Sequence, residues 1–292
     1  MIAFEKKFDS VYYLECPYGG CFTGITLIKG KKNYIIDSAG SKECITDILI
    51  PALNALDLEI TDIDYLLNTH THADHIGGHE TIKALSPSTT VITYRKSEDK
   101  VRDPLKYNRM IREVFPKHSP QPNSALRGVE PDLIIDDGYV LLDELMFISC
   151  EGHDDDSGAW LHIPSGTLIC GDSLQLNGTS VQGIALYMDL ISYKNTIKKL
   201  RTLKLKNLIA GHDYIPLGAY AAGEEAVDAY LRTCEEYVEE YHRYIRIAYS
   251  KGMSAPEIAK ALIHHVGAKE PQYLFLPLYT VTEHLKEISK EQ

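Results

Sequence analysis

Three histidines and an aspartate fall within six consecutive positions of this chain, in the segment 68–78. His70 and His72 stand two residues apart after an apolar run, so in an extended segment their side chains point the same way and can hold one metal ion together. Asp74 and His75 follow where a helix is expected to begin, and they could hold a second ion. Imidazole and carboxylate ligands suit zinc, and also iron or manganese.

Such a cluster has few explanations without a metal. A single histidine at a strand end is usually a polar residue with a hydrogen-bond partner. Three histidines in one short segment crowd groups that become positive on protonation, and this crowding brings no structural benefit in the absence of a metal ion. We therefore interpret the segment 68–78 as metal-binding.

Three later segments share one pattern, in which a strand-like run is followed by a glycine and then by a histidine or aspartate. Both residue types are common metal ligands, and the end of a strand is a place where a side chain can face a shared edge of a sheet. The three candidates are His153 after the run 145–150, Asp172 after 167–170 and His212 after 207–210.

The segment from His70 to His75 resembles the H-x-H-x-D-H signature of the metallo-β-lactamase superfamily, and the later candidates occur in the order that this superfamily uses. The resemblance covers residues from about 20 to 215. It implies a mixed α/β (α+β) fold, the four-layer αββα sandwich, with two divalent metal ions at one edge of the sheets. The implied ligands are His70, His72 and His153 for the first ion, Asp74, His75 and His212 for the second, and Asp172 as a bridge between them.

The resemblance also implies a reaction. Two metal ions held about 3.5–4 Å apart convert a bridging water into hydroxide at neutral pH, and this hydroxide attacks an acyl or phosphoryl centre. We therefore expect a dinuclear metal-dependent hydrolase that prefers zinc, with iron or manganese as alternatives. Asp74 and Asp172 are the expected catalytic carboxylates, and Asp74 could also orient the hydroxide or transfer a proton.

Branches of the superfamily differ in some of their ligands and in additional residues or segments, and these features can be compared with this sequence. The true β-lactamases keep no bridging aspartate at the position of Asp172, and the flavin-linked diiron branch replaces the equivalent of His72 by glutamate. Lactonases share all seven ligands and add a tyrosine, for which Tyr187 lies in the right region. Glyoxalase-II-like thioesterases share the ligands too, but their basic tail is not evident. An ester, thioester or lactone is the expected substrate.

Two alternatives come from other functional classes. The first is a phosphodiesterase or ribonuclease of the same superfamily, because the segment 168–218 also resembles that group. The formal net charge of −11 argues against nucleic acid as a partner. The second is a non-catalytic regulator in which 254–290 forms a winged-helix-like module, although a helical pair that packs on the core or on a second subunit explains this region better.

Apolar and polar periodicity places the elements around these residues. We expect strands at 22–28, 33–37, 63–68, 89–94 and several positions between 132 and 170, with helices at 42–56 and 190–203. We expect a catalytic domain over 1–218 and a helical extension over 219–292, with helices at 224–249, 254–266 and 273–290. The extension could form a homodimer, because the apolar stripe of 224–249 needs a covering surface.

The segment 95–128 departs from this pattern, because it carries four prolines and is long for a simple connection. We interpret it as a lid-like insertion. Between 94 and 128 it holds nine lysines and arginines against four acidic residues, and a basic patch in an acidic chain attracts anions. Arg109 and Arg112, three residues apart on an expected helix, are the candidate pair for an anionic group of the substrate. A solvated helix explains the same charges nearly as well.

Composition limits the remaining choices. Apolar residues make up 44% of the chain and charged residues 24%, which is typical of a globular protein, and no run is long enough to span a membrane. The six cysteines show no C-x-x-C spacing and predict reduced thiols, so we expect a cytoplasmic protein. The run 154–156 of three aspartates is interpreted as a solvated loop. His79 is interpreted as a surface residue or a partner of a ligand.

Overall fold

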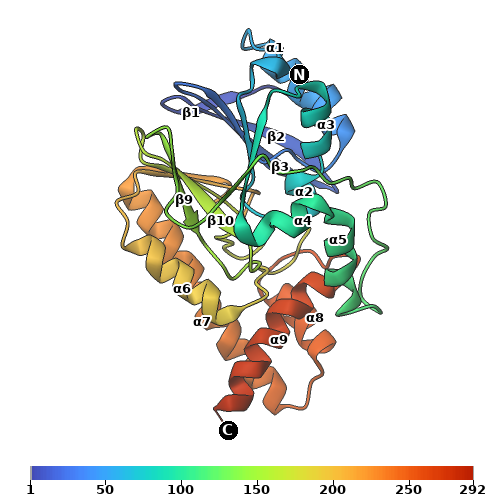
Figure 1. Cartoon of the computed structure of the whole chain (residues 1–292). Coiled ribbons are helices and arrows are strands. Elements are labelled where there is room, and N and C mark those ends of the chain that lie inside the picture. The colour runs from blue at the N-terminus through green and yellow to red at the C-terminus, as the bar shows by residue number, and fades with distance from the viewer. Residues whose placement is uncertain (1, 292) are drawn as a thin grey trace.

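Two β-sheets lie face to face at the centre of the molecule, and helices cover the outer face of each sheet (Figure 1). The computed structural model describes residues 2–291. This arrangement confirms the predicted four-layer αββα sandwich with helices at its C-terminal end.

The first sheet is mixed. Its strands follow one another in space in chain order, antiparallel from β1 to β4 and parallel from β4 to β7. The carboxyl ends of the parallel strands therefore meet at one edge, where the metal-binding segment begins. The bounds are β1 (Glu5–Phe8), β2 (Val11–Tyr18), β3 (Cys21–Lys29), β4 (Asn33–Ile36), β5 (Tyr65–Leu67), β6 (Thr90–Tyr94) and β7 (Leu133–Ile135).

The second sheet has the spatial order β13-β12-β11-β10-β9-β8 and is antiparallel except for the pair β11 and β12. The last strand, β13, lies beyond residue 218, in the region expected to be helical, and extends this sheet by pairing with β12. The bounds are β8 (Val140–Leu141), β9 (Leu145–Ser149), β10 (Gly158–His162), β11 (Thr167–Gly171), β12 (Asn207–Ala210) and β13 (Tyr220–Ala222).

Short helices cover the first sheet. The helix expected at 42–56 begins as a π-helical turn, η1 (Cys44–Leu49), and continues as α1 (Ile50–Asn54). Pro51 is the second residue of α1, at the junction between the π-helical turn and the α-helix, and its ring provides no N–H for a helical hydrogen bond. The other elements here are η2 (Ile60–Asp62), α2 (Ala73–Ile76) and α3 (His79–Leu85).

Three apolar clusters fill the spaces between the layers. Ile82 belongs to the cluster between the first sheet and its helices. Phe147 and Trp160 belong to the cluster between the two sheets. Tyr193 and Tyr230 belong to the cluster outside the second sheet, which α6 (Leu190–Arg201) and the C-terminal helices cover. Each layer is thus held by burial of its own apolar face.

The C-terminal helices are α7 (Glu224–Ser250), α8 (Ala255–His265) and α9 (Phe275–Lys290). The predicted stripe of α7 is buried at Tyr230, Cys234 and Tyr241. It is covered within the chain, because α7 packs on α6, α8 and α9 (Figure 1). The apolar stripe of α7 therefore gives no reason to expect a dimer. No helix within the described residues combines the length and the apolar composition needed to cross a bilayer.

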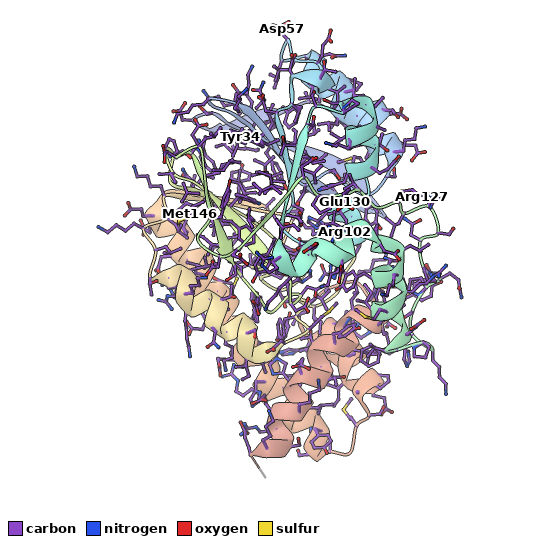
Figure 2. The ribbon with its side chains drawn as sticks, viewed as in Figure 1. Tyr34, Asp57, Arg102, Arg127, Glu130 and Met146 are labelled. Carbon is purple, nitrogen blue, oxygen red and sulfur yellow. The ribbon has the colours of Figure 1, made fainter. Side chains whose placement is uncertain are left out.

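The insertion after β6 forms η3 (Arg95–Ser97), α4 (Glu98–Arg102) and α5 (Pro104–Glu113), followed by an irregular return to β7. Its two ends are tied together by Arg102, whose Nη2 lies 2.6 Å from Oε1 of Glu130; Figure 2 labels both side chains. Tyr279 on α9 also donates a hydrogen bond of 2.7 Å to the carbonyl of Ile111 on α5. The insertion is therefore held against the C-terminal helices.

Candidate metal centre

The structure brings all seven predicted ligands together at one edge of the sandwich. The first sheet supplies four of them from the connection between β5 and α2 and from α2 itself. The second sheet supplies three from the loops that directly follow β9, β11 and β12. The seven are His70, His72, Asp74 and His75 from the first sheet, and His153, Asp172 and His212 from the second.

One half of the centre is formed by His70, His72 and His153. Their nitrogen atoms include a set that lies mutually within 4.8 Å. Nδ1 of His72 lies 3.0 Å from Nε2 of His153, so these two atoms face a common point. Three converging imidazoles are a common ligand set for zinc.

The other half is formed by Asp74, His75 and His212, whose ligand atoms likewise lie within 4.8 Å of one another. Oδ2 of Asp74 is 3.2 Å from Nε2 of His212 and 3.6 Å from Nε2 of His75. This half has a carboxylate among its ligands, which the other half lacks.

Asp172 lies between the two halves. Its Oδ1 is 3.3 Å from Nε2 of His75, and its Oδ2 is 3.4 Å from Nε2 of His212 and 3.6 Å from Nε2 of His153. One carboxylate thus reaches histidines of both halves, as a bridging ligand must.

The donor atoms fit metal ions. Nε2 of His70, Nε2 of His75 and Oδ1 of Asp172 are buried and have no hydrogen-bond partner. Buried polar atoms rarely remain unpaired in proteins, and two facing ions would satisfy these three. On three of the histidines the opposite ring nitrogen has a carboxylate or a backbone carbonyl as its partner, as metal-binding histidines require, whereas Nε2 of His72 is buried without a hydrogen-bond partner among the described residues. Nδ1 of His75 is 2.8 Å from Oδ2 of Asp37, Nδ1 of His153 is 3.0 Å from the carbonyl of Leu186, and Nδ1 of His212 faces the carbonyl of Phe22.

The glycine that precedes each ligand of the second sheet has a steric reason. A Cβ on Gly211 would lie 2.3 Å from Oδ1 of Asp172 and 2.8 Å from Cε1 of His75. Gly171 has a φ of +49°, and a Cβ there would lie 2.2 Å from Oγ1 of Thr69. Only glycine permits this approach of the two sheets beside the ligands.

Charge divides the centre. Burial, together with repulsion from neighbouring histidines, lowers the pKa of His70, and burial lowers the pKa of His72 and of His153 to about 4 each. Burial acts in the same direction on His75, but the carboxylates around it outweigh burial and raise its pKa to about 10. The pKa of His212 is raised above its usual value for the same reason. The first three imidazoles are therefore neutral near pH 7 in the metal-free protein.

Two supporting residues were not assigned from the sequence. Asp37, which directly follows β4, holds His75 and also accepts hydrogen bonds from the backbone N–H and the hydroxyl of Thr69, both at 2.8 Å. Gln175 donates to Oδ2 of Asp172 at 3.2 Å, and its Nε2 lies 3.1 Å from Nδ1 of His153. Only the place of Asp37 after a strand that neighbours β5 could have indicated its role.

The interpretation of 154–156 as a solvated loop is wrong for two of its three aspartates. Asp154 and Asp156 are buried, and only Asp155 is exposed. Lys100 from α4 reaches into this run and compensates its charge.

His79 is also not at the surface: it is buried, and its Nδ1 lies 2.7 Å from Oγ of Ser38, whose backbone contacts that of His75. The alternative interpretation of His79 as a partner of the ligand region fits this position.

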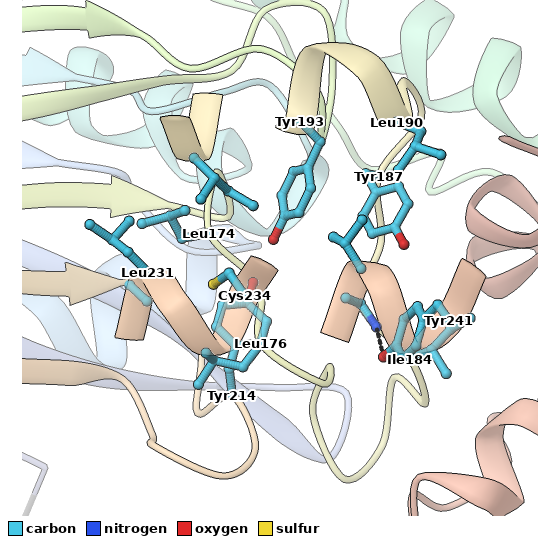
Figure 3. Close-up of a cluster of buried hydrophobic side chains, with 14 of the residues drawn as sticks. Leu174, Leu176, Ile184, Tyr187, Leu190, Tyr193, Tyr214, Leu231, Cys234 and Tyr241 are labelled. Atoms are coloured by element: carbon cyan, nitrogen blue, oxygen red, sulfur yellow. Dashed lines mark hydrogen bonds between the residues drawn. The ribbon is translucent and has the colours of Figure 1, made fainter. Parts of the chain in front are cut away.

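The structure does not place Tyr187 at the candidate active site. Its side chain is fully buried in the apolar cluster outside the second sheet, stacked on Tyr193 (Figure 3). Its hydroxyl lies 2.6 Å from Nε2 of His284 on α9. Tyr187 is therefore a core residue, and the sequence could not reveal this because its partner stands 97 positions later.

A cavity of about 390 Å³ opens over the candidate metal centre. It is bounded on the metal side by five of the seven predicted ligands, and on the opposite side by α5 and the segment 271–276. Arg112 lines this cavity and also an adjoining hollow beside α5, whereas Arg109 is exposed and lines only the second of these. The expected pair of arginines is thus divided, and only Arg112 faces the centre.

Four of the nine basic side chains of the insertion pair with carboxylates. Arg95 pairs with Asp136, Lys96 with Glu151, Arg102 with Glu98 and Glu130, and Lys100 with the acidic run 154–156. Within residues 2–291, Arg112 has no carboxylate at ion-pair distance. Its Nη1 donates a hydrogen bond of 2.7 Å to the carbonyl of Asn108, and its buried Nε has no partner.

Comparison with known proteins agrees with this architecture. A family model described as the metallo-beta-lactamase superfamily matches residues 18–212. The chain is 24% identical to the Beta-lactamase-like protein 2 homolog of Caenorhabditis elegans over 254 residues, covering 83% of this chain and 70% of the other. It is 21% identical to the Probable metallo-hydrolase YqjP of Bacillus subtilis, covering 92% and 88%.

Solved structures show the same fold. A metallo-beta-lactamase family protein from Thermus thermophilus superposes with a TM-score of 0.74 at 19% identity, covering 97% of this chain and 95% of that one. At this identity the likeness establishes the fold alone. Because the family model spans more than half of the sequence, the chain belongs to the metallo-beta-lactamase superfamily, as a hydrolase of that fold.

Proposed function

We propose that this protein uses two divalent metal ions, with zinc as the preferred metal, to hydrolyse a small ester, thioester or lactone that carries an anionic group. The observation that carries the anionic part of the proposal is Arg112, a cation without a paired carboxylate in the cavity above the candidate metal centre.

The seven ligands would hold the two ions as the sequence predicts, with Asp172 reaching both halves. When bound, such ions supply a hydroxide nucleophile at neutral pH and polarise the scissile carbonyl. Asp74 has a role beyond ligation, because its Oδ2 lies at the floor of the cavity and accepts a hydrogen bond of 3.2 Å from Oγ1 of Thr23. This contact fixes the orientation of the carboxylate, and His75 and His212 outweigh its burial and lower its pKa, so Asp74 would act in its ionised form.

Arg112 lies in an apolar setting. Its guanidinium carbon is 5.3 Å from the ring centroid of Phe275, and burial lowers its pKa from the usual value. An arginine nevertheless remains charged, and a half-buried cation with no counter-ion among the described residues is less favourable than a paired one. A carboxylate or phosphate of the substrate would provide that counter-ion and would gain a charge-assisted hydrogen bond.

The other walls of the cavity favour an apolar body for the substrate. The side chains of Ile111, Leu186, Phe275 and Leu276 all line it. The size is that of a cavity for a small molecule, and its arginine stands alone, so it does not provide the row of cations with which proteins bind nucleic acid.

The test compares substrates that differ in one charge. Four-nitrophenyl butyrate and the four-nitrophenyl monoester of succinic acid share an acyl chain of the same length, and the second ends in a carboxylate. We expect a lower KM for the succinate ester, and we expect Arg112→Gln to raise that KM by about 10- to 100-fold, since a hydrogen bond to a charged group contributes about 1.5–3 kcal/mol. The butyrate ester should be unaffected.

Arg109→Gln is the matched control, because Arg109 lies three residues earlier on the same helix and outside the cavity. Equal KM values for the two esters, or an equal effect of the two substitutions, would overturn the role of Arg112. A matched thioester, a lactone and bis(4-nitrophenyl) phosphate complete the panel. Turnover of the phosphodiester alone would favour the phosphodiesterase alternative.

The metal content has a direct test. Elemental analysis of protein purified without chelator should find about two transition-metal ions per chain, because seven ligands converge there. Fully active protein without metal would overturn the proposal.

A cytoplasmic location is part of the proposal and is supported by six unpaired cysteines, of which five are buried, since a reducing compartment keeps thiols in this state. Microscopy of the tagged full chain in its own cell would test it.

A further inference from the structure

His72 has an outward-facing nitrogen with a specific neighbour. Because its Nδ1 faces His153, its Nε2 must carry the proton and point away from the predicted metal. That nitrogen lies 3.4 Å from Oδ2 of Asp154, whose side chain is 5% exposed, and neither atom has a hydrogen-bond partner among the described residues, so each is free to pair with the other. Asp154 is therefore placed to set the tautomer and the ring plane of His72.

Asp154 occupies an unfavourable place for a carboxylate. It is followed by Asp155 and Asp156, and the carboxylates of Asp154 and Asp156 are both buried, so two acidic side chains lie close together out of contact with water. Asp156 is stabilised in part by hydrogen bonds to its Oδ2 from the hydroxyls of Thr71, at 2.7 Å, and Ser97, at 2.9 Å. Asp154 has no comparable hydroxyl donor among the described residues; its Oδ1 accepts hydrogen bonds from the backbone N–H of Asp155, at 2.7 Å, and from a nearby cation.

Lys100 is that cation. Its Nζ lies 2.9 Å from Oδ1 of Asp154 and 3.3 Å from Oδ1 of Asp156, and it also pairs with Asp155. The Lys100 side chain is 13% exposed, unlike a lysine that serves solubility. Its Nζ also lies 4.2 Å from the centroid of the Tyr107 ring.

Tyr107 links this lysine to His72 by a second route. Its ring is nearly parallel to that of His72, with 6.2 Å between centroids and 16° between planes. The polar contact through Asp154 and the aromatic contact through Tyr107 thus reach the same imidazole from two sides. Both depend on the position of Lys100 on α4 of the insertion.

We infer that Lys100 is a positioning residue for the first half of the metal centre, holding the side chains of Asp154 and Tyr107 in place so that His72 presents Nδ1 to the metal. The inference rests on the proposed two-metal site. It also gives the insertion 95–128 a second task beside shaping the cavity, since one of its helices fixes a predicted ligand.

The test is Lys100→Met, which keeps the length of the side chain and removes its charge, with Lys106→Met as control. Lys106 is exposed on α5 and has no ion pair within the described residues. Zinc affinity is measured by competition with a chromophoric chelator, and cobalt is used to record the visible spectrum. We expect Lys100→Met to weaken one of two sites by about 10- to 100-fold, as loss of a supporting contact does, and to change the spectrum of that site alone.

Two further variants keep the test decisive if Lys100→Met folds poorly. Asp154→Asn should weaken the same site by the same factor, and the double variant Lys100→Met/Asp154→Asn, which carries no charge mismatch, should be no weaker than either single variant. Wild-type affinity in the double variant would overturn the inference, because Lys100 would then only neutralise a buried charge. Unchanged affinity in all three would overturn it too. Failure of wild-type protein to bind two ions would instead count against the proposed function.

Discussion

The two halves of the candidate metal centre are built from the same residue types but in opposite electrostatic settings. His72 and His153 lie among other imidazoles, and the carboxylates near them, such as Asp154 and Asp172, only partly offset burial, which lowers the pKa of each to about 4. His75 contacts Asp37 and Asp172, with Asp74 nearby, and these carboxylates raise its pKa to about 10 despite burial.

This difference indicates how each half would receive an ion. In the first half the imidazoles are already neutral at pH 7, so metal binding displaces few protons. In the second half a protonated His75 already provides the positive charge that the carboxylates require, and a metal must displace that proton. In the second half, the proton on His75 therefore competes with the metal ion. The metal affinity of this half should rise more steeply with pH than that of the first half.

Asp172→Ala should have the largest effect, because this carboxylate reaches histidines of both halves. We expect a loss of hydrolysis of about 10³-fold, corresponding to about 4 kcal/mol of transition-state stabilisation. Elemental analysis should find less than two ions per chain. His212→Ala is the sharper companion and should empty mainly the second half. Full activity with two ions in Asp172→Ala would show that the halves do not share this ligand.

In the metal-free protein, the two halves should make the free energy of unfolding depend on pH in opposite directions. For His72 the folded-state pKa of about 4 lies below the ordinary 6.5, so stability falls as pH drops from 6.5 toward 4, by up to ~3 kcal/mol. For His75 the folded-state pKa is raised, so its contribution is complete below 6.5 and is lost as pH rises toward 10. Urea denaturation at pH 5, 7 and 9 measures both.

Two substitutions show which histidine causes the fall in stability at acid pH (the acid limb) and which causes the fall at alkaline pH (the alkaline limb). His72→Gln should flatten the acid limb and leave the alkaline limb, and His75→Gln should do the reverse. If both substitutions change the same limb, the electrostatic contrast between the halves is wrong.

Asp37→Asn should have the smallest effect of the set. It preserves the shape of the side chain but removes a charge that supports His75 at 2.8 Å. We expect zinc affinity to fall by about 10-fold at one site, because supporting contacts typically contribute about 10- to 100-fold. Competition with a chelator measures the change. Loss at the first site in place of the second would contradict the assignment of His75.

Much of this centre could be predicted because its ligands are local features of the sequence. His70 and His75 stand beside a buried run, and His153, Asp172 and His212 each follow a strand-like run and a glycine. Gly171 and Gly211 are required where the two sheets approach each other, and Gly152 where its loop passes the backbone of Tyr193 on α6, so the pattern that marked the ligands has a direct steric cause.

The rest depends on contacts between distant positions. Lys100 meets Asp154 across 54 residues, and a run of three aspartates with no visible partner is interpreted as solvated. The strand β2 was not foreseen, because Pro17 and Glu15 interrupt its apolar pattern. The strand β13 is only three residues long and gains its order from pairing with β12. Such residues reveal their role only once the chain is folded.

The origin of the ligands on both sheets has a consequence for folding stability. His70 and His75 belong to the first sheet, while His153, Asp172 and His212 belong to the second, so each bound ion would act as a crosslink across the sandwich. A ligand that binds only the folded chain stabilises it by about 2.7 kcal/mol at a free concentration one hundred times its Kd. The melting temperature should therefore rise with free zinc, and the survival of the folded protein in a cell would follow the supply of metal.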